Sequence, residues 1–244
     1  MSLMRIPSLL SPAVAGLLLA LMVACGGDVP GPEASESSSA ATASDPEVRE
    51  GEPLGASEGS SRLLVLGTSL TEGYGLDRPE SEAWPALLGE IAETEGVHLE
   101  IRNAGLSGET SAGALRRIDW VLDAPPEIFV LETGANDGLR GLDPAALEAN
   151  LDSIFARVEA QAPGAVRVLA GMEAPPNLGT PYVEEFRAVF PRVAERWDAI
   201  LIPFLLEGVA GEPSLNQSDG IHPTPEGHRR IAETVWEVLG PRLR

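Results

Sequence analysis

The sequence predicts an α/β fold, a three-layer α/β/α sandwich around a central parallel sheet of about five strands. Short apolar runs alternate along the chain with longer segments in which apolar residues recur every three or four positions. Such alternation of strand and helix produces parallel strands joined by right-handed crossovers, with helices on both faces of the sheet. The apolar runs are residues 63–66, 97–101, 128–131, 166–170 and 200–204.

Helical periodicity fills the segments between and after these runs. Apolar side chains at i, i+3, i+4 and i+7 form one face of a helix, and we interpret each such stripe as a core face and not as a cofactor site. In chain order, the stripes consist of Trp84, Leu87, Leu88 and Ile91; Leu115, Ile118 and Leu122; Leu147, Leu151, Ile154, Phe155 and Val158; Phe186, Val189, Phe190, Val193 and Trp197; and Ile231, Val235, Val238 and Leu239.

Residues 1–25 have the layout of a secretory signal peptide. Arg5 precedes an apolar stretch at residues 13–24 that is too short for a comfortable membrane span. The sequence Met-Val-Ala-Cys at residues 22–25 resembles the lipobox of bacterial lipoproteins, although leucine is usual where Met22 stands. The resemblance implies that Cys25, the only cysteine, is lipidated and becomes the first residue of the mature chain. In the alternative, an ordinary signal peptide is removed and Cys25 is incidental.

Residues 26–61 are predicted to be a flexible, acidic tether. This segment contains eight Ser and eight Asp or Glu, no aromatic residue, and only Val29, Val48 and Leu54 as sizeable apolar residues, so it cannot bury enough surface to fold. The folded domain is then residues 62–244. Acyl chains on Cys25 would hold it at a membrane, as a lipoprotein of the bacterial cell envelope that faces the periplasm or the exterior.

Charge and composition exclude several classes of function. The formal net charge is -20, so nucleic acid is not an expected partner. All 17 basic residues are Arg, which excludes a P-loop lysine, a Schiff base with pyridoxal phosphate and a Ser-Lys dyad. With three His and one Cys, no zinc site of the usual kinds is expected, and we expect no cofactor.

Small and polar residues gather directly after the first three apolar runs. The loops are residues 67–69 (Gly-Thr-Ser), 103–108 (Asn-Ala-Gly-Leu-Ser-Gly) and 133–137 (Thr-Gly-Ala-Asn-Asp). A fourth polar segment, residues 218–223 (Ser-Asp-Gly-Ile-His-Pro), precedes the last helix. Ligands bind at the carboxyl ends of the strands in such sheets, so we expect the first three loops to open on one functional edge.

Ser69 is a candidate nucleophile, and a serine hydroxyl needs a base that a carboxylate orients. Of the three histidines, His98 lies in a predicted strand, and His228 lies among charged residues of the last helix, where we expect it at the surface. His222 lies in a loop three residues after Asp219, so imidazole and carboxylate can meet within one turn. In the alternative, Asp219 forms an Asx turn next to an unrelated histidine.

Acyl transfer also needs hydrogen-bond donors where the oxyanion forms. The candidates are the backbone N–H groups of Ser69 and Gly108 and the side-chain amide of Asn136. Taken singly, Gly108 is better interpreted as a turn glycine and Asn136 as an ordinary loop residue.

Taken together and in order, four segments resemble the sequence blocks of the SGNH, or GDSL, hydrolase superfamily. They read GTSLTEGYG at 67–75, NAGLSGETS at 103–111, ETGANDGLRG at 132–141 and DGIHP at 219–223. The resemblance extends over nearly all of residues 62–239 and is greatest to the branch of bacterial arylesterases and thioesterase I/lysophospholipase L1 enzymes. It implies the flavodoxin-like fold of that superfamily.

Position by position, the resemblance implies that Ser69 is the nucleophile, His222 the general base and acid, and Asp219 its orienting carboxylate. It implies that Gly108 and Asn136 donate to the oxyanion beside the amide of Ser69. Thr68 departs from the family's pattern, which has Asp at this position. We expect the Thr68 hydroxyl to keep the turn in place.

The expected function is that of a serine esterase, which hydrolyses small carboxylic esters, and also thioesters or lysophospholipids, through an acyl-enzyme. One alternative keeps the fold and the triad and acts on acetylated carbohydrate. The other, motivated by Thr68, is a binding lipoprotein without catalytic activity. Acyl-chain preference and oligomeric state do not follow from the sequence.

Overall fold

The computed structural model describes residues 59–244 of the chain. The predicted signal peptide, its lipidated Cys25 and all but the last three residues of the predicted tether lie outside the described residues. Regular structure begins at Ser61, the first residue of β1. None of the helices in the described part of the chain is long and apolar enough to cross a membrane.

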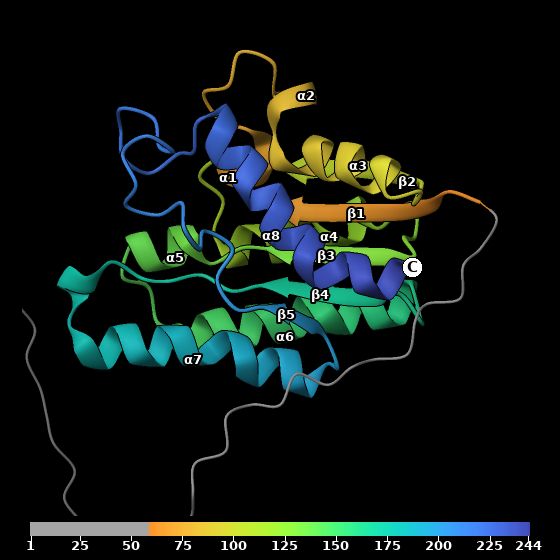
Figure 1. The fold of residues 1–244 in the computed structure, drawn as a ribbon. Coiled ribbons are helices and arrows are strands. Elements are labelled where there is room, and N and C mark those ends of the chain that lie inside the picture. The colour runs from red at the N-terminus through yellow and green to blue at the C-terminus, as the bar shows by residue number, and fades with distance from the viewer. Residues whose placement is uncertain (1–58) are drawn as a thin grey trace, which may run out of the picture. The chain divides into compact units, whose positions relative to one another are not determined.

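Five parallel strands form one sheet in the order β2-β1-β3-β4-β5 (Figure 1). The parallel sheet of about five strands predicted from the sequence is thus confirmed. The strands are β1 (Ser61–Gly67), β2 (Leu99–Gly105), β3 (Ile128–Glu132), β4 (Val166–Ala170) and β5 (Ile200–Ile202). Because β1 pairs with β2 on one side and with β3 on the other, it lies inside the sheet and ends between two neighbours.

Several strand boundaries differ from the predicted runs. β1 extends the run 63–66 at both ends and β3 adds Glu132, while β2 and β5 differ more. β2 begins at Leu99 instead of residue 97 and runs on to Gly105, because it pairs with β1 over the full length of both strands. The amide of Val97 instead closes the preceding helix by donating to the carbonyl of Ala92. β5 ends at Ile202, and the following Pro203 has no N–H to continue the ladder.

The helices form a layer on each face of the sheet. On one face, α3 (Trp84–Thr94) packs against α8 (Pro225–Leu243). On the other, α4 (Ser111–Val121) packs on α6 (Pro144–Gln161), and α6 packs on α7 (Thr180–Arg196). The five predicted stripes all fall on these helices. The remaining helical segments are short: α1 (Ser69–Glu72), α2 (Pro79–Glu82), α5 (Ala135–Leu139) and the 3₁₀ turn η1 (Pro176–Leu178).

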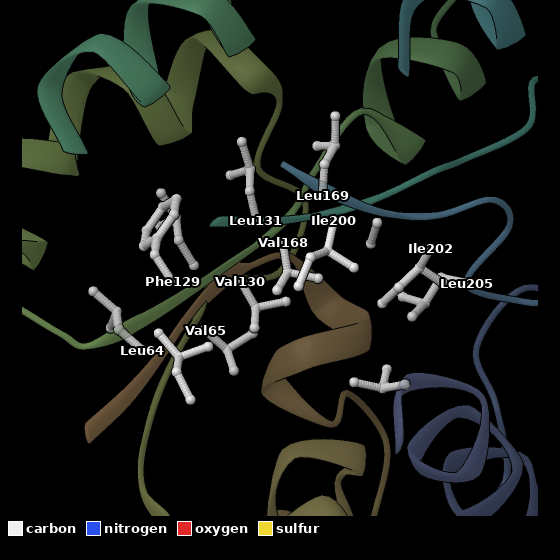
Figure 2. Close-up of a cluster of buried hydrophobic side chains, with 14 of the residues drawn as sticks. Leu64, Val65, Phe129, Val130, Leu131, Val168, Leu169, Ile200, Ile202 and Leu205 are labelled. Carbon is white, nitrogen blue, oxygen red and sulfur yellow. The ribbon is translucent and has the colours of Figure 1, made fainter. Parts of the chain in front are cut away.

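The core lies on both faces of the sheet, because successive side chains of a strand point to opposite sides. Figure 2 shows Phe129 and Leu131 of β3 on one side of the sheet and Val130 on the other. All residues of β3 are buried, which is the pattern of a central strand covered by two helix layers. The sandwich leaves only the edges of the sheet open, and the carboxyl edge carries the candidate site.

Candidate active site

The polar loops predicted from the sequence meet at the carboxyl edge of the sheet. Since all five strands are parallel, their carboxyl ends lie together. Figure 1 shows α1, α5 and the long loop before α8 at this end of the strands. Two segments of this edge are named here: the serine turn, residues 67–72, and the histidine loop, residues 217–223.

The serine turn begins where β1 ends. Gly67 is the last residue of the strand, and a Cβ at this position would lie 2.0 Å from Oγ1 of Thr71 and 2.7 Å from Oε2 of Glu132, so only glycine fits. Ser69 follows as the first residue of α1, with its side chain partly exposed. The hydroxyl of Ser69 therefore stands at the end of an interior strand.

The histidine loop brings an imidazole to this hydroxyl from far along the chain. Nε2 of His222 lies 3.1 Å from Oγ of Ser69, and Nδ1 lies 2.7 Å from Oδ2 of Asp219. The other carboxylate oxygen of Asp219 accepts hydrogen bonds from the backbone N–H groups of Ile221 and His222. Hydrogen bonds from the backbone and side chain of His222, together with that of Ile221, lower the pKa of Asp219 to about 2. Asp219 is thus a carboxylate at neutral pH, next to the histidine.

Gln217 and Tyr74 connect the histidine loop to the serine turn. Nε2 of Gln217 donates to the carbonyl of Tyr74, just beyond α1, and to the carbonyl of Pro223. The backbone N–H of Gln217 donates to the carbonyl of His222. The ring of Tyr74 lies against the ring of His222, with 4.5 Å between centroids. Neither Gln217 nor Tyr74 is among the predicted site residues: Gln217 has no motif signal, and Tyr74 lies in the segment GTSLTEGYG, whose candidate residue is Ser69.

The other two histidines lie away from Ser69. His98 is exposed and bonded to Glu93, in keeping with a solvent-facing position. The prediction that His228 lies at the surface is wrong, because this side chain is fully buried. His228 occupies the first turn of α8 on the side that faces α3, and its Nδ1 accepts a hydrogen bond from the backbone N–H of Trp84. Burial lowers the pKa of His228 to about 4.

Gly108 lies in the loop after β2 and Asn136 in the first turn of α5, where the sequence predicts a loop, and a hydrogen bond joins the two segments. Gly108 has φ +75°, a conformation that favours glycine, and its carbonyl accepts a hydrogen bond from Arg140. One side-chain N–H of Asn136 donates to the carbonyl of Glu109, which leaves its second N–H for another acceptor. Ser69 presents the first amide of α1, which has no acceptor within the helix.

A partly buried ion pair supports the loop that carries Gly108. Arg117 pairs with Glu109 at 2.6 Å, and its guanidinium also donates to the carbonyls of Gly67 and Ala104 at the ends of β1 and β2. Arg117 therefore joins two strand ends to the residue that follows Gly108. No sequence pattern distinguishes Arg117, since a charged residue on an amphipathic helix is normally solvated.

A buried carboxyl group lies next to the serine turn. Glu132, the last residue of β3, is fully buried and accepts hydrogen bonds from the backbone N–H and the hydroxyl of Thr68 and from the hydroxyl of Thr71. Burial raises the pKa of Glu132 to about 7, although these hydrogen bonds oppose the shift. The sequence signal for Glu132 is its position, a single acid directly after the apolar run at residues 128–131.

The described residues of this edge include no candidate metal-binding group. Within residues 59–244, no group of three or more His, Cys, Asp or Glu side chains is placed to hold a metal ion. What the arrangement offers is a hydroxyl, an imidazole, a carboxylate and three amide donors on neighbouring loops and short helices.

Comparison with known proteins identifies a family and close relatives. The model of the GDSL-like Lipase/Acylhydrolase family matches residues 65–230. The chain is 43% identical over 182 residues to the esterase TesA of Pseudomonas aeruginosa. The aligned region covers 74% of this chain and 89% of that protein. The chain is also 37% identical over 180 residues to the thioesterase 1/protease 1/lysophospholipase L1 of Escherichia coli, over 73% of this chain and 83% of that one.

A solved structure supports the same relationship. The crystal structure of TesA superimposes with a TM-score of 0.70 at 42% sequence identity, over 75% of this chain and all of that chain. The three-layer architecture predicted from the sequence is therefore confirmed both by the strand order and by a structural relative.

Proposed function

The chain belongs to the GDSL-like lipase/acylhydrolase family, and we propose that this ester hydrolase acts through an acyl-enzyme formed on Ser69. The observation that carries the proposal is the chain of contacts from Asp219 through His222 to Ser69, at 2.7 Å and 3.1 Å. A hydroxyl, an imidazole and a carboxylate in this order form the arrangement that activates serine nucleophiles in unrelated folds.

In the first half of the reaction, Oγ of Ser69 attacks the ester carbonyl carbon while Nε2 of His222 takes the hydroxyl proton. The carboxylate of Asp219 accepts a hydrogen bond from Nδ1–H, which fixes the tautomer and stabilises the imidazolium. The tetrahedral intermediate then expels the alcohol, which receives the proton from His222, and leaves Ser69 acylated. In the second half, His222 takes a proton from water as the water oxygen attacks the acyl carbon. The tetrahedral intermediate then breaks its bond to Oγ of Ser69, which takes the proton back from His222, and the carboxylic acid is released.

Three donors are positioned to stabilise the oxyanion: the amides of Ser69 and Gly108 and the free side-chain N–H of Asn136. The hydrogen bond from Asn136 to the carbonyl of Glu109 supports this assignment, since it holds the Asn136 side chain next to the residue that follows Gly108. Each donor of this kind contributes about 3 kcal/mol to transition-state stabilisation in serine hydrolases.

The exposed apolar side chains favour esters with an apolar acyl group over acetylated carbohydrate. Most exposed large hydrophobic residues of the described chain lie on segments that follow the strand ends: Tyr74, Leu106, Leu139, Leu142, Leu178 and Ile221. Leu178 lies near Gly141, so η1 and the loop after α5 adjoin at this edge. An aliphatic chain is removed from water by such a surface, whereas a sugar needs polar partners.

The test compares Ser69→Ala with Ser153→Ala, a serine whose hydroxyl bonds to its own helix on α6. Ser69→Ala should abolish hydrolysis of p-nitrophenyl esters and labelling by a fluorophosphonate probe, and Ser153→Ala should retain both. Wild-type turnover by the Ser69→Ala protein would refute the assignment, and an unlabelled, inactive wild type would favour a binding protein. A series of p-nitrophenyl esters of increasing chain length, with acetylated xylan beside it, separates the substrate classes.

We also propose that Cys25 carries a lipid anchor, so that the enzyme acts at a membrane of the cell envelope. The lipobox-like sequence at residues 22–25 supports this proposal. Cys25→Ala should abolish incorporation of labelled palmitate and shift the protein from the membrane to the soluble fraction. An unchanged membrane fraction in this variant would contradict the anchor.

A further inference from the structure

Glu132 is a fully buried carboxyl group that the proposed mechanism does not use. It ends β3, beside the end of β1, and lies close to the α-carbon of Gly67. Among residues 59–244, no arginine or histidine forms an ion pair with it. A buried acid without a cationic partner is costly, so its hydrogen bonds must provide its stabilisation.

Those hydrogen bonds come from both sides of Ser69. Thr68, which precedes the serine, donates its backbone N–H at 2.8 Å and its hydroxyl at 2.9 Å. Thr71, two residues after it, donates its hydroxyl at 2.8 Å. A carboxylate has about four acceptor sites, so a single side chain accepts all three donors. Glu132 thus fixes the chain on either side of Ser69 to the end of a central strand.

The hydrogen bond from the Thr68 hydroxyl to Glu132 takes the place of an ordinary helix cap. Thr68 is the N-cap residue of α1, and threonine at this position usually accepts a hydrogen bond from an N–H of the first turn. Here the side chain makes no capping bond and donates to Glu132 instead. The family's aspartate would be an acceptor if ionised, and it would place a second negative charge against Glu132.

We propose that Glu132 is the positioning residue of the nucleophile: it accepts hydrogen bonds from Thr68 and Thr71 and so holds Oγ of Ser69 at Nε2 of His222. The inference rests on the proposed function of Ser69. Thr68 is then the partner of Glu132, and its departure from the family's pattern is compatible with an active site. Misplacement of a reacting group by about 1 Å costs on the order of a hundredfold in rate, so loss of this support should reduce turnover.

The first test compares Glu132→Met with Glu132→Gln. Met approximates the shape of Glu but accepts none of the three hydrogen bonds. Gln keeps one oxygen for the N–H of Thr68 and the hydroxyl of Thr71, while its NH₂ donates to the hydroxyl of Thr68. We expect Glu132→Met to lower kcat for p-nitrophenyl butyrate about tenfold or more with KM within about twofold. Glu132→Gln should rescue kcat to within about threefold of wild type.

The second test keeps the proposal open to refutation if Glu132→Met does not fold. Thr68→Val has nearly the shape of threonine but lacks the hydroxyl, and Thr68→Ser retains it. The rate of inactivation by a fluorophosphonate reports the reactivity of Ser69 directly. We expect this rate to fall about fivefold or more in folded Thr68→Val and to stay within about twofold in Thr68→Ser.

The outcomes separate this inference from the proposed function. If wild type is active and Ser69→Ala inactive, while folded Glu132→Met or Thr68→Val reacts at the wild-type rate, the positioning role is wrong and the assignment of Ser69 stands. Equal losses in Glu132→Gln and Glu132→Met would also overturn the role of the hydrogen bonds. If Ser69→Ala retains wild-type activity, the proposed function itself fails.

Discussion

The serine turn and the histidine loop are held in place in opposite ways. The serine turn lies on the core: Thr68 and Thr71 are buried and bonded to Glu132, a residue more than sixty positions away. The histidine loop is largely exposed, with 40% of the Asp219 side chain accessible to solvent, and its central bonds join residues three positions apart or fewer.

This difference shows how two segments meet at one reaction centre without the same kind of support. The polar groups of a buried turn need hydrogen-bond partners within the protein, so the geometry of the turn depends on distant strands. An exposed turn obtains its geometry from its own side chains, since water satisfies what remains. The histidine loop then needs few contacts outside itself: Gln217 donates to the carbonyl of Tyr74, just beyond α1, and its bond to the carbonyl of Pro223 lies within the loop.

The largest expected effect comes from the chemistry of the histidine loop. His222→Ala removes the base, and kcat for p-nitrophenyl butyrate should fall by about 10⁴ or more, as for the histidine of other serine hydrolases. His98→Ala is the matched control, because the exposed side chain of His98 is bonded to Glu93, and it should keep wild-type kcat. Equal activity of the His222→Ala and wild-type proteins would remove His222 from the mechanism.

A smaller loss of kcat is expected from the oxyanion donors next to the serine turn. Asn136→Ala deletes one proposed oxyanion donor and should lower kcat about 10²- to 10³-fold, with less change in KM. Steady-state kinetics at saturating ester measures both parameters. An effect confined to KM would place Asn136 in ground-state binding and not at the oxyanion.

A loss of about tenfold is expected when the tie between the two segments is cut. Gln217→Ala removes the hydrogen bonds to the carbonyls of Tyr74 and Pro223, so His222 should spend less time at Ser69. Gln161→Ala is the matched control, because Gln161 bonds to the exposed Asp119 on the far helices. Similar kcat values for the two variants would show that the histidine loop holds its position unaided.

The smallest effect on activity, and a distinct effect on stability, is expected from His228 in the helix that follows the histidine loop. Burial lowers the pKa of His228 to about 4, so below about pH 6.5 the unfolded chain binds a proton that the folded chain does not. This group's stabilisation is present at pH 7 and decreases as the pH falls from about 6.5 to about 4. Its loss should reach about 2 kcal/mol at pH 4.5.

Urea unfolding of wild type and His228→Gln at pH 7 and pH 4.5 isolates this contribution. Gln offers an oxygen to the N–H of Trp84 and does not titrate, so the variant should lose less stability than wild type on acidification. Identical losses in both proteins would show that His228 is not protonated on unfolding.

Much of the fold and part of the site could be predicted from the sequence. The apolar runs and stripes gave all five strands and the five long helices, because burial of one face repeats with the period of the element. The sequence predicts Ser69, Asp219 and His222 as site residues because each lies in a polar segment next to an apolar run or the last helix. The structure brings these three residues into contact. The positions of strand ends were predicted less exactly, since β2 pairs with β1 beyond its own apolar residues.

What the sequence by itself determined is the set of elements and the candidate site residues, because both follow from local periodicity and from residue chemistry. Only the tertiary structure decided the environment of each group: that His228 is buried, that Gln217 ties two loops together, and that Thr68 bonds to Glu132. The physical reason is that burial and hydrogen bonding depend on partners far apart in the chain, and a local sequence pattern does not predict which distant residue will be in contact.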